Sequence, residues 1–204
     1  HVLEEEYSGR EDFRNELAIT NDGESARDFD DAISLKRLSS GNFLLGVHIS
    51  DVSHYVPEGS AIDSDAYKRG TSVYFPDRAI PMLPPELSSG ICSLKSGVDR
   101  LVLSALIEIN AKGKVLAVRF AEGVLRSHAR MTYTTVAKIL VDHDPKERTC
   151  YRDLIPLFEM MEELCLILSQ KRYRRGAVDF DLPEAEMQFD EKGRIISVVP
   201  AERN

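Results

Sequence analysis

The chain has 204 residues, of which 43% are hydrophobic and 29% are charged. That length and composition favour one packed globular domain and exclude a disordered or low-complexity chain. The 26 Lys and Arg side chains stand against 34 Asp and Glu, so the net charge is −8. This balance excludes a protein that binds polyanions through a uniformly basic surface, and any nucleic-acid site must be local.

In the first third of the chain, hydrophobic residues follow the patterns of short strands. Three strands are predicted: residues 17–20, 32–36 and 43–52. An acidic loop over 21–31 separates the first two, and a turn-rich segment joins the second and third into a hairpin. Ser60 and Asp63 have the Ser-x-x-acid spacing of a helix start, so a short helix is expected over 61–69.

Prolines interrupt the next segment, and regular patterns return after it. Residues 71–90 contain four prolines and are typical of a loop, with 73–76 extended within it. The later elements predicted are strands over 100–110 and 114–127, helices over 133–140 and 153–175, and a final hairpin over 186–199. We therefore expect a single α+β domain with a largely antiparallel twisted sheet and packed helices.

Cysteine usage and hydropathy indicate the compartment. Cys92, Cys150 and Cys165 are odd in number and have no zinc-ligand or disulfide-framework spacing, which favours a reducing cytoplasm. No apolar run approaches the roughly 20 residues of a membrane span, so neither a membrane protein nor a secreted one is expected. Because the sequence starts with His1 and ends at Asn204 directly after a strand-like run, we expect it to be part of a longer protein.

Four aspartates lie within ten residues of one another: Asp22, Asp28, Asp30 and Asp31. Crowded carboxylates raise one another's pKa, and a divalent cation removes that penalty by stabilising each ionised oxygen. Carboxylate oxygen is the hard ligand that Mg²⁺ or Mn²⁺ prefers, and the loop has no His or Cys. In extended backbone Asp28 and Asp30 share one side, while Phe29 and Asp31 point to the other, and Phe29 can anchor the loop in the core. The pattern indicates a magnesium site suited to phosphoryl chemistry.

From the residues alone, two other interpretations of the acidic loop remain open. Acidic runs are commonly solvated surface, and some bind calcium structurally, although the strict calcium-loop spacing is absent here. His48 and His54 are residue types that could act as a general base. They lie on a predicted strand and at its exit, where packing or surface roles are commoner, so both are left out of the site.

The segment Ile19-Thr20-Asn21-Asp22-Gly23-Glu24-Ser25-Ala26-Arg27-Asp28-Phe29-Asp30-Asp31-Ala32 resembles the signature of the catalytic (RNB) domain of the ribonuclease II/ribonuclease R family. Further segments resemble this family in the same order: residues 45–56, 69–78, 80–84, 91–94 and 127–133. The similarity spans nearly the whole chain and is strongest to the ribonuclease R branch. Asn21 departs from the pattern, because the family usually has an apolar residue there.

This resemblance implies a metal-dependent, processive 3′→5′ exoribonuclease that hydrolyses RNA, from a single-stranded 3′ end, to nucleoside 5′-monophosphates. The implied catalytic residues and metal ligands are Asp22, Asp28, Asp30 and Asp31, with Asp30 the most critical to cleavage. The implied cofactor is Mg²⁺, as one or two ions, with Mn²⁺ as a substitute. Tyr74 would stack on a base near the scissile end and Tyr133 would contact the nucleotide, with simple packing as the alternative for each.

The resemblance also sets limits on what this chain does alone. The family's catalytic domain continues beyond the position of Asn204, so residues 1–204 correspond to its amino-terminal portion, without cold-shock or S1 RNA-binding domains. The missing portion would carry a catalytic arginine, so little activity is expected from this chain alone. RNA is the expected partner, and the full enzyme is expected to be monomeric and cytoplasmic. The alternatives are a non-catalytic RNA- or protein-binding module of this family, and an acidic, metal-stabilised structural domain.

Overall fold

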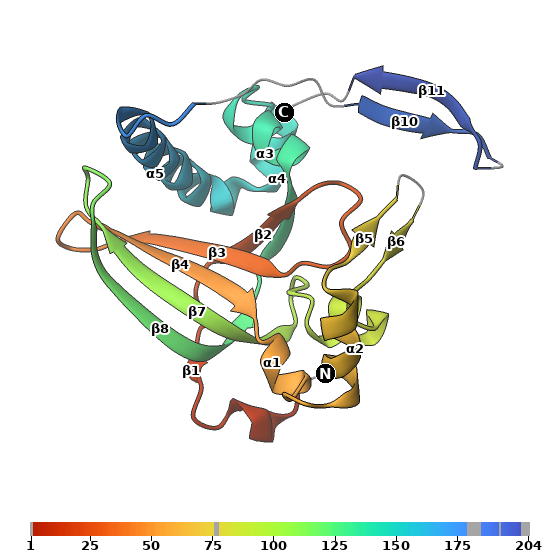
Figure 1. Ribbon diagram of the computed structural model, residues 1–204. Coiled ribbons are helices and arrows are strands. Elements are labelled where there is room, and N and C mark those ends of the chain that lie inside the picture. The colour runs from red at the N-terminus through yellow and green to blue at the C-terminus, as the bar shows by residue number, and fades with distance from the viewer. Residues whose placement is uncertain (1, 76–77, 179–184, 192, 201–204) are drawn as a thin grey trace.

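The computed structural model describes residues 2–75, 78–178, 185–191 and 193–200. At the centre of these residues is a seven-stranded sheet with the order β1-β8-β7-β4-β3-β2-β9 (Figure 1). Its strands are β1 (Glu11–Asp12), β2 (Ala18–Asp22), β3 (Asp31–Arg37), β4 (Phe43–Ser50), β7 (Asp99–Ile109), β8 (Val115–Arg126) and β9 (Ala129–Thr132). The inner neighbours run antiparallel, and only the edge pairs β1–β8 and β2–β9 are parallel.

Helices and two small hairpins surround this sheet. The α-helices are α1 (Val52–Tyr55), α2 (Ala61–Arg69), α3 (Tyr133–Leu140), α4 (Pro145–Cys150) and α5 (Ile155–Arg174). Short turns are the 3₁₀ segments Glu4–Tyr7 and Arg152–Leu154 and a π-helical turn, Leu87–Ile91. The hairpins are β5 (Val73–Tyr74) with β6 (Ala79–Ile80), and β10 (Ala185–Phe189) with β11 (Ile195–Pro200). None of the helices in the described ranges is long and apolar enough to cross a bilayer.

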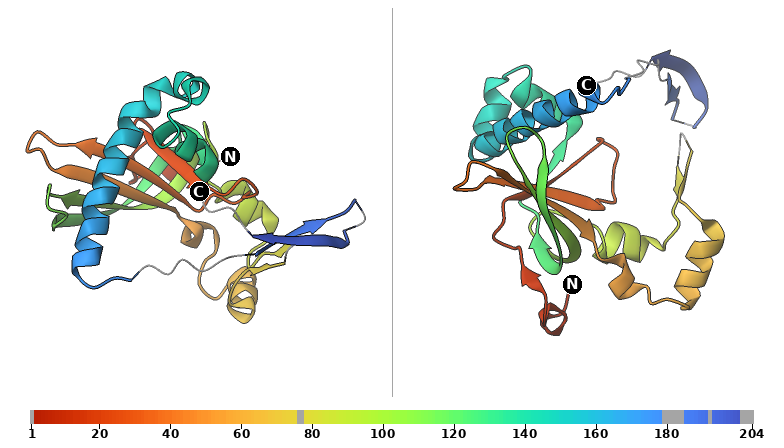
Figure 2. Two further views of the ribbon diagram at one scale, coloured as in Figure 1. Left: turned by 90° about the horizontal axis from the view of Figure 1, so that it is seen from above. Right: turned by 60° about the vertical axis from the view of Figure 1, so that its left-hand side comes forward.

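The two faces of the sheet belong to different cores. Helix α5 lies across one face (Figure 2), where Phe158 and Leu164 pack with Phe43 and Ile109. Side chains alternate along a strand, so the neighbouring residues point to the opposite face. There a second core forms around buried side chains that come from strands and loops: Phe13, Ala18, Phe29, Ala32, Leu94, Val102 and Leu125. Phe29 therefore anchors the acidic loop in the core, as the alternation predicts.

The α+β class and the largely antiparallel sheet are confirmed, and most predicted elements exist within a few residues of their expected bounds. The strand predicted over 43–52 is two residues too long, because the Asp51 side chain accepts the His54 N–H and caps α1. Helix α4 and the four-residue β9 were not predicted, since both are too short to show a period. In the segment predicted as extended over 73–76, Pro76 lies outside the described residues.

Candidate metal centre and active site

The acidic loop leaves and re-enters the sheet at one edge. Strand β2 ends at Asp22 and β3 begins at Asp31, and the two strands pair antiparallel through Ile19 and Ile33. Because antiparallel neighbours bring the end of one strand beside the start of the next, the two ends of the loop over 23–30 lie side by side (Figure 1). The fold therefore brings the first and last aspartates of the sequence cluster to the same place.

The carboxylates lie within electrostatic reach of one another. Burial raises the pKa of Asp22, and the charges of Asp31, Asp30 and Asp28 raise it further, against an opposing effect of Arg130. Asp30 is exposed as a residue, yet partial desolvation of its carboxyl group raises its pKa, and the charges of Asp28 and Asp31 add to the effect. This is the electrostatic arrangement that a bound divalent cation would relieve.

The carboxylate oxygens of the loop are suitable donors for a hard cation, although the four carboxylates do not converge on one point. The Oδ2 atom of Asp22 is buried and has no hydrogen-bond partner, which leaves a carboxylate oxygen free to accept a ligand. Over the part of the chain that the structure describes, no three His, Cys, Asp or Glu side chains converge closely enough to hold a metal ion. The four aspartates thus share a neighbourhood, and coordination would require their side chains to turn towards a common point.

Arg130 holds the same loop from the neighbouring strand and was missed in the sequence. Its Nη2 atom donates to the carbonyl oxygens of Gly23 and Glu24, each at 3.0 Å, and its guanidinium lies 5.4 Å from the centre of the Phe29 ring. Parallel pairing of β2 with β9 places Arg130 opposite Thr20. In the sequence Arg130 lies only within the family motif at 127–133, because no local pattern predicts that a strand forms beside β2.

The two predicted RNA-binding tyrosines stand in different places. Tyr133 is the first residue of α3 and directly follows Thr132, which is paired with Asp22 in the sheet. The fold therefore brings Tyr133 to the acidic edge, which is the end of the sheet where β2 stops at Asp22 and β3 starts at Asp31. Tyr74 lies on the β5–β6 hairpin, which projects away from the main sheet (Figures 1 and 2). Tyr74 is 72% exposed and Tyr133 56% exposed, so neither side chain is a core residue and both rings are accessible for stacking.

The two histidines set aside in the sequence have structural partners. His48 is buried between Ser34 and Ser104, whose hydroxyl oxygens lie 3.0 Å and 2.8 Å from its ring nitrogens. Burial lowers the pKa of His48 to about 4, so the ring is neutral at pH 7. His54 lies 2.8 Å from Glu6 near the N-terminal turn. Neither ring is part of the acidic loop, which agrees with leaving both out of the site.

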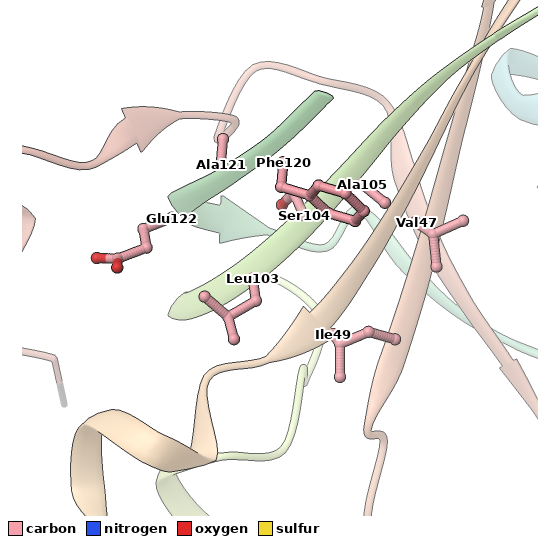
Figure 3. Close-up of a pocket in the computed structure, with 8 residues that line it drawn as sticks. All are labelled: Val47, Ile49, Leu103, Ser104, Ala105, Phe120, Ala121 and Glu122. Atoms are coloured by element: carbon pink, nitrogen blue, oxygen red, sulfur yellow. The ribbon is translucent and has the colours of Figure 1, made fainter. Parts of the chain in front are cut away.

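A cavity of about 690 Å³ opens over strands β4, β7 and β8 (Figure 3). It is lined by Val47, Ile49, Leu103, Ser104, Ala105, Phe120, Ala121 and Glu122. Asp31 is paired with Ile49 across β3 and β4, so the cavity begins one strand away from the acidic loop. The lining is mainly apolar and its one charged group is a carboxylate, which does not suit an RNA phosphate.

Known proteins resemble this chain along its whole length. The family model described as the RNB domain matches residues 10–204. A ribonuclease R of Thermotoga maritima is 46% identical over 99% of this chain and 28% of its own length, and that of Escherichia coli K12 is 42% identical over 100% and 25%. The structure of Mycoplasma genitalium RNase R in complex with double-stranded RNA superposes with a TM-score of 0.92 at 29% identity, over 100% of this chain and 36% of that one. The chain thus spans about a quarter of the length of these curated relatives, and it belongs to the RNB domain family.

Proposed function

We propose that this chain is part of a metal-dependent, processive 3′→5′ exoribonuclease that hydrolyses RNA to nucleoside 5′-monophosphates. The observation that carries the proposal is the acidic loop in a chain of the RNB family. All four aspartates of the family signature are present between β2 and β3, with a free, buried oxygen on Asp22. A protein that had lost catalysis would have no use for four mutually repelling carboxylates.

Mg²⁺ is the proposed cofactor, as one or two ions, and Mn²⁺ could take its place. The carboxylates of Asp22, Asp28, Asp30 and Asp31 would hold it. Bound there, it would supply Lewis-acid polarisation of the scissile phosphodiester and positive charge for the leaving oxygen. The chain itself positions these ligands, because the Phe29 ring is buried in the core and Ser50 N–H donates to the Asp30 carbonyl oxygen at 2.9 Å.

RNA would be held next to the loop by aromatic stacking. Tyr133 lies at the acidic edge and Tyr74 on a projecting hairpin, and both rings are exposed. Every base has a π-face, so stacking is independent of sequence and contributes roughly 1–3 kcal/mol per base. Such a grip suits an enzyme that advances along a single strand from its 3′ end. The relative of known structure bound to RNA supports RNA as the partner.

The chain covers only about a quarter of its curated relatives, and we assign it to the amino-terminal portion of the catalytic domain. From the family resemblance we expect a catalytic arginine in the remaining portion. Little hydrolysis is therefore expected from residues 1–204 alone, because a cation opposite the metal site stabilises transition-state charge. We expect the intact enzyme to act as a monomer in the cytoplasm.

The decisive test is Asp30→Asn in the intact protein, assayed by release of nucleoside 5′-monophosphates from single-stranded RNA in Mg²⁺. We expect the rate to fall by about 100-fold or more, because an amide supplies neither the charge nor the basicity of the carboxylate. Asp153→Asn is the matched control, since the Asp153 side chain is 90% exposed and its only described salt bridge joins the adjacent Arg152. Wild-type cleavage by Asp30→Asn would exclude the catalytic assignment.

A second function is favoured by one observation, namely that the aspartates do not converge on a common point among the described residues. On that basis the chain would be a non-catalytic module that holds RNA or a protein. Filter binding and product analysis on the same samples separate the two functions. Retention of RNA without any nucleotide release, with Mg²⁺ or Mn²⁺ present, would favour the binding module over the nuclease.

A further inference from the structure

The backbone of Phe29, between Asp28 and Asp30, is held at both its N–H and its C=O by one distant segment. The backbone N–H of Phe29 donates to the Ser93 hydroxyl at 3.1 Å, and the backbone N–H of Leu94 donates to the Phe29 carbonyl oxygen at 2.8 Å. Ser93 is completely buried, so water does not compete for its hydroxyl. Phe29 is thus fixed by its ring, its N–H and its C=O.

Arg100 in turn holds the segment that carries Ser93. Its Nε atom donates to the Ser93 carbonyl oxygen at 2.8 Å, and its Nη2 atom donates to the Gly90 carbonyl oxygen at 3.3 Å. Its Nη1 atom donates to the carbonyl oxygen of Asp99 at 2.9 Å. Arg100 belongs to β7, which is paired with β4 on one side and β8 on the other, so these bonds tie the segment to the sheet.

This use of a buried arginine is costly for the fold. Arg100 is only 9% exposed, and its described hydrogen bonds all go to main-chain carbonyl groups rather than to a carboxylate. The carboxylate of the adjacent Asp99 is instead engaged by Arg126, at 2.7 Å. A buried guanidinium without a close carboxylate partner loses hydration that carbonyl dipoles only partly replace. The arrangement gives the loop a fixed backbone rather than the greatest stability.

A fixed backbone at Phe29 matters because its two neighbours are the proposed metal ligands. Alternation places the Asp28 and Asp30 side chains on the side away from the buried ring. Their approach to a common cation depends on the orientation of the two peptide groups that flank Phe29. Groups that orient metal ligands commonly change metal affinity by about 10–100-fold when they are removed.

We propose that Ser93 and Arg100 are positioning residues, which hold the Phe29 backbone so that Asp28 and Asp30 can bind one divalent cation. Ser93 acts through its hydrogen bond to the Phe29 N–H, and Arg100 acts through the Ser93 carbonyl group. The inference rests on the proposed function only in taking the aspartates as metal ligands.

The test compares Ser93→Ala with Ser104→Ala in the intact protein. Each change removes one buried hydroxyl and one hydrogen bond, but Ser104 contacts His48 inside the sheet and does not touch the acidic loop. Mn²⁺ binding is followed by the electron paramagnetic resonance signal of the free ion. We expect Ser93→Ala to weaken Mn²⁺ binding by about 10-fold and Ser104→Ala to leave it unchanged, even where both lower the Tm.

Arg100→Lys is the second variant, because it retains the positive charge but cannot reach several carbonyl groups at once. It should weaken Mn²⁺ binding to a similar extent. Wild-type Mn²⁺ affinity in both Ser93→Ala and Arg100→Lys would overturn the inference, and so would an unsubstituted protein that binds no Mn²⁺. Metal binding and RNA cleavage are measured separately. Mn²⁺ binding that depends on Ser93, in a protein that leaves RNA intact, would support the positioning role and reject the nuclease.

Discussion

The α5 side of the sheet and its acidic edge differ in what their described residues bury: apolar side chains on the α5 side, and polar atoms without partners at the edge. Under α5, Phe43, Ile109 and Phe158 form an apolar core in which each side chain is almost completely buried. At the acidic edge, buried polar atoms remain without partners: Thr20 Oγ1, Asn21 Oδ1, Asp22 Oδ2 and Arg130 Nε. Four of the seven such atoms found in the described ranges belong to this one edge.

The two regions therefore differ in how much each contributes to the stability of the fold. Unsatisfied buried groups cost free energy, and native proteins keep few of them. Their concentration beside the four aspartates of the acidic loop supports the proposal that this edge takes a ligand, while the α5 side is adapted to packing. Asn21 fits this picture, because the residue that departs from the family pattern adds no described hydrogen bond through its Oδ1 atom.

The largest effect is expected on the packed side. Phe158→Ala removes a ring that is 1% exposed, and the cavity it leaves should lower the free energy of unfolding by about 3–5 kcal/mol. Urea unfolding measures this change. Leu166→Ala on the same helix is the control, because Leu166 is 58% exposed and should cost little. The metal affinity of folded Phe158→Ala should match that of the wild type, and a weaker affinity would show that the two regions are coupled.

A smaller effect is expected at the edge itself. Tyr133→Ala removes an exposed ring beside the acidic loop and should weaken the binding of single-stranded RNA by about 1–3 kcal/mol. Fluorescence anisotropy with labelled RNA measures the affinity. Tyr173→Ala is the control, because Tyr173 is similarly exposed at 52% but lies near the far end of α5. Equal losses in the two variants would mean that RNA does not select the acidic edge.

The last effect is a pH dependence of opposite sign in the two regions. The folded-state pKa of Asp22 is raised above its ordinary value of 3.8, so its contribution to stability is present below pH 3.8 and is lost as the pH rises through the folded pKa. The pKa of His48 falls from 6.5 to about 4, so its contribution is present above pH 6.5 and is lost as the pH falls towards 4.

Urea unfolding between pH 4 and pH 7, in a chelator, separates these contributions. Asp22→Asn should remove the part that declines with rising pH, and His48→Gln should remove the part that increases. Mg²⁺ added to the wild type should abolish the decline, because the cation stabilises the ionised carboxylates. A pH profile unchanged by Asp22→Asn would show that the carboxyl group is not strained in the metal-free protein.

Most of the longer elements, and the chemistry of the acidic loop, could be predicted from the sequence. Hydrophobic periodicity located the long strands and helices, because each periodicity reports which face of an element is buried. The spacing of Asp28, Phe29 and Asp30 indicated an anchored acidic loop, since alternation in extended backbone is a local property. The family resemblance implied roles for the four aspartates and both tyrosines, but it gave none of them a position in space.

Only the tertiary structure decided which residues hold that loop. Arg130 reaches it because β9 pairs parallel with β2, and Ser93 reaches it from a segment more than sixty residues away in the chain. Periodicity carries no information about such partners, because strand order and register are set by packing over the whole sheet. The same packing brings Asp22 beside Asp31 while leaving the four carboxylates short of a common point, which is the arrangement that a bound cation would complete.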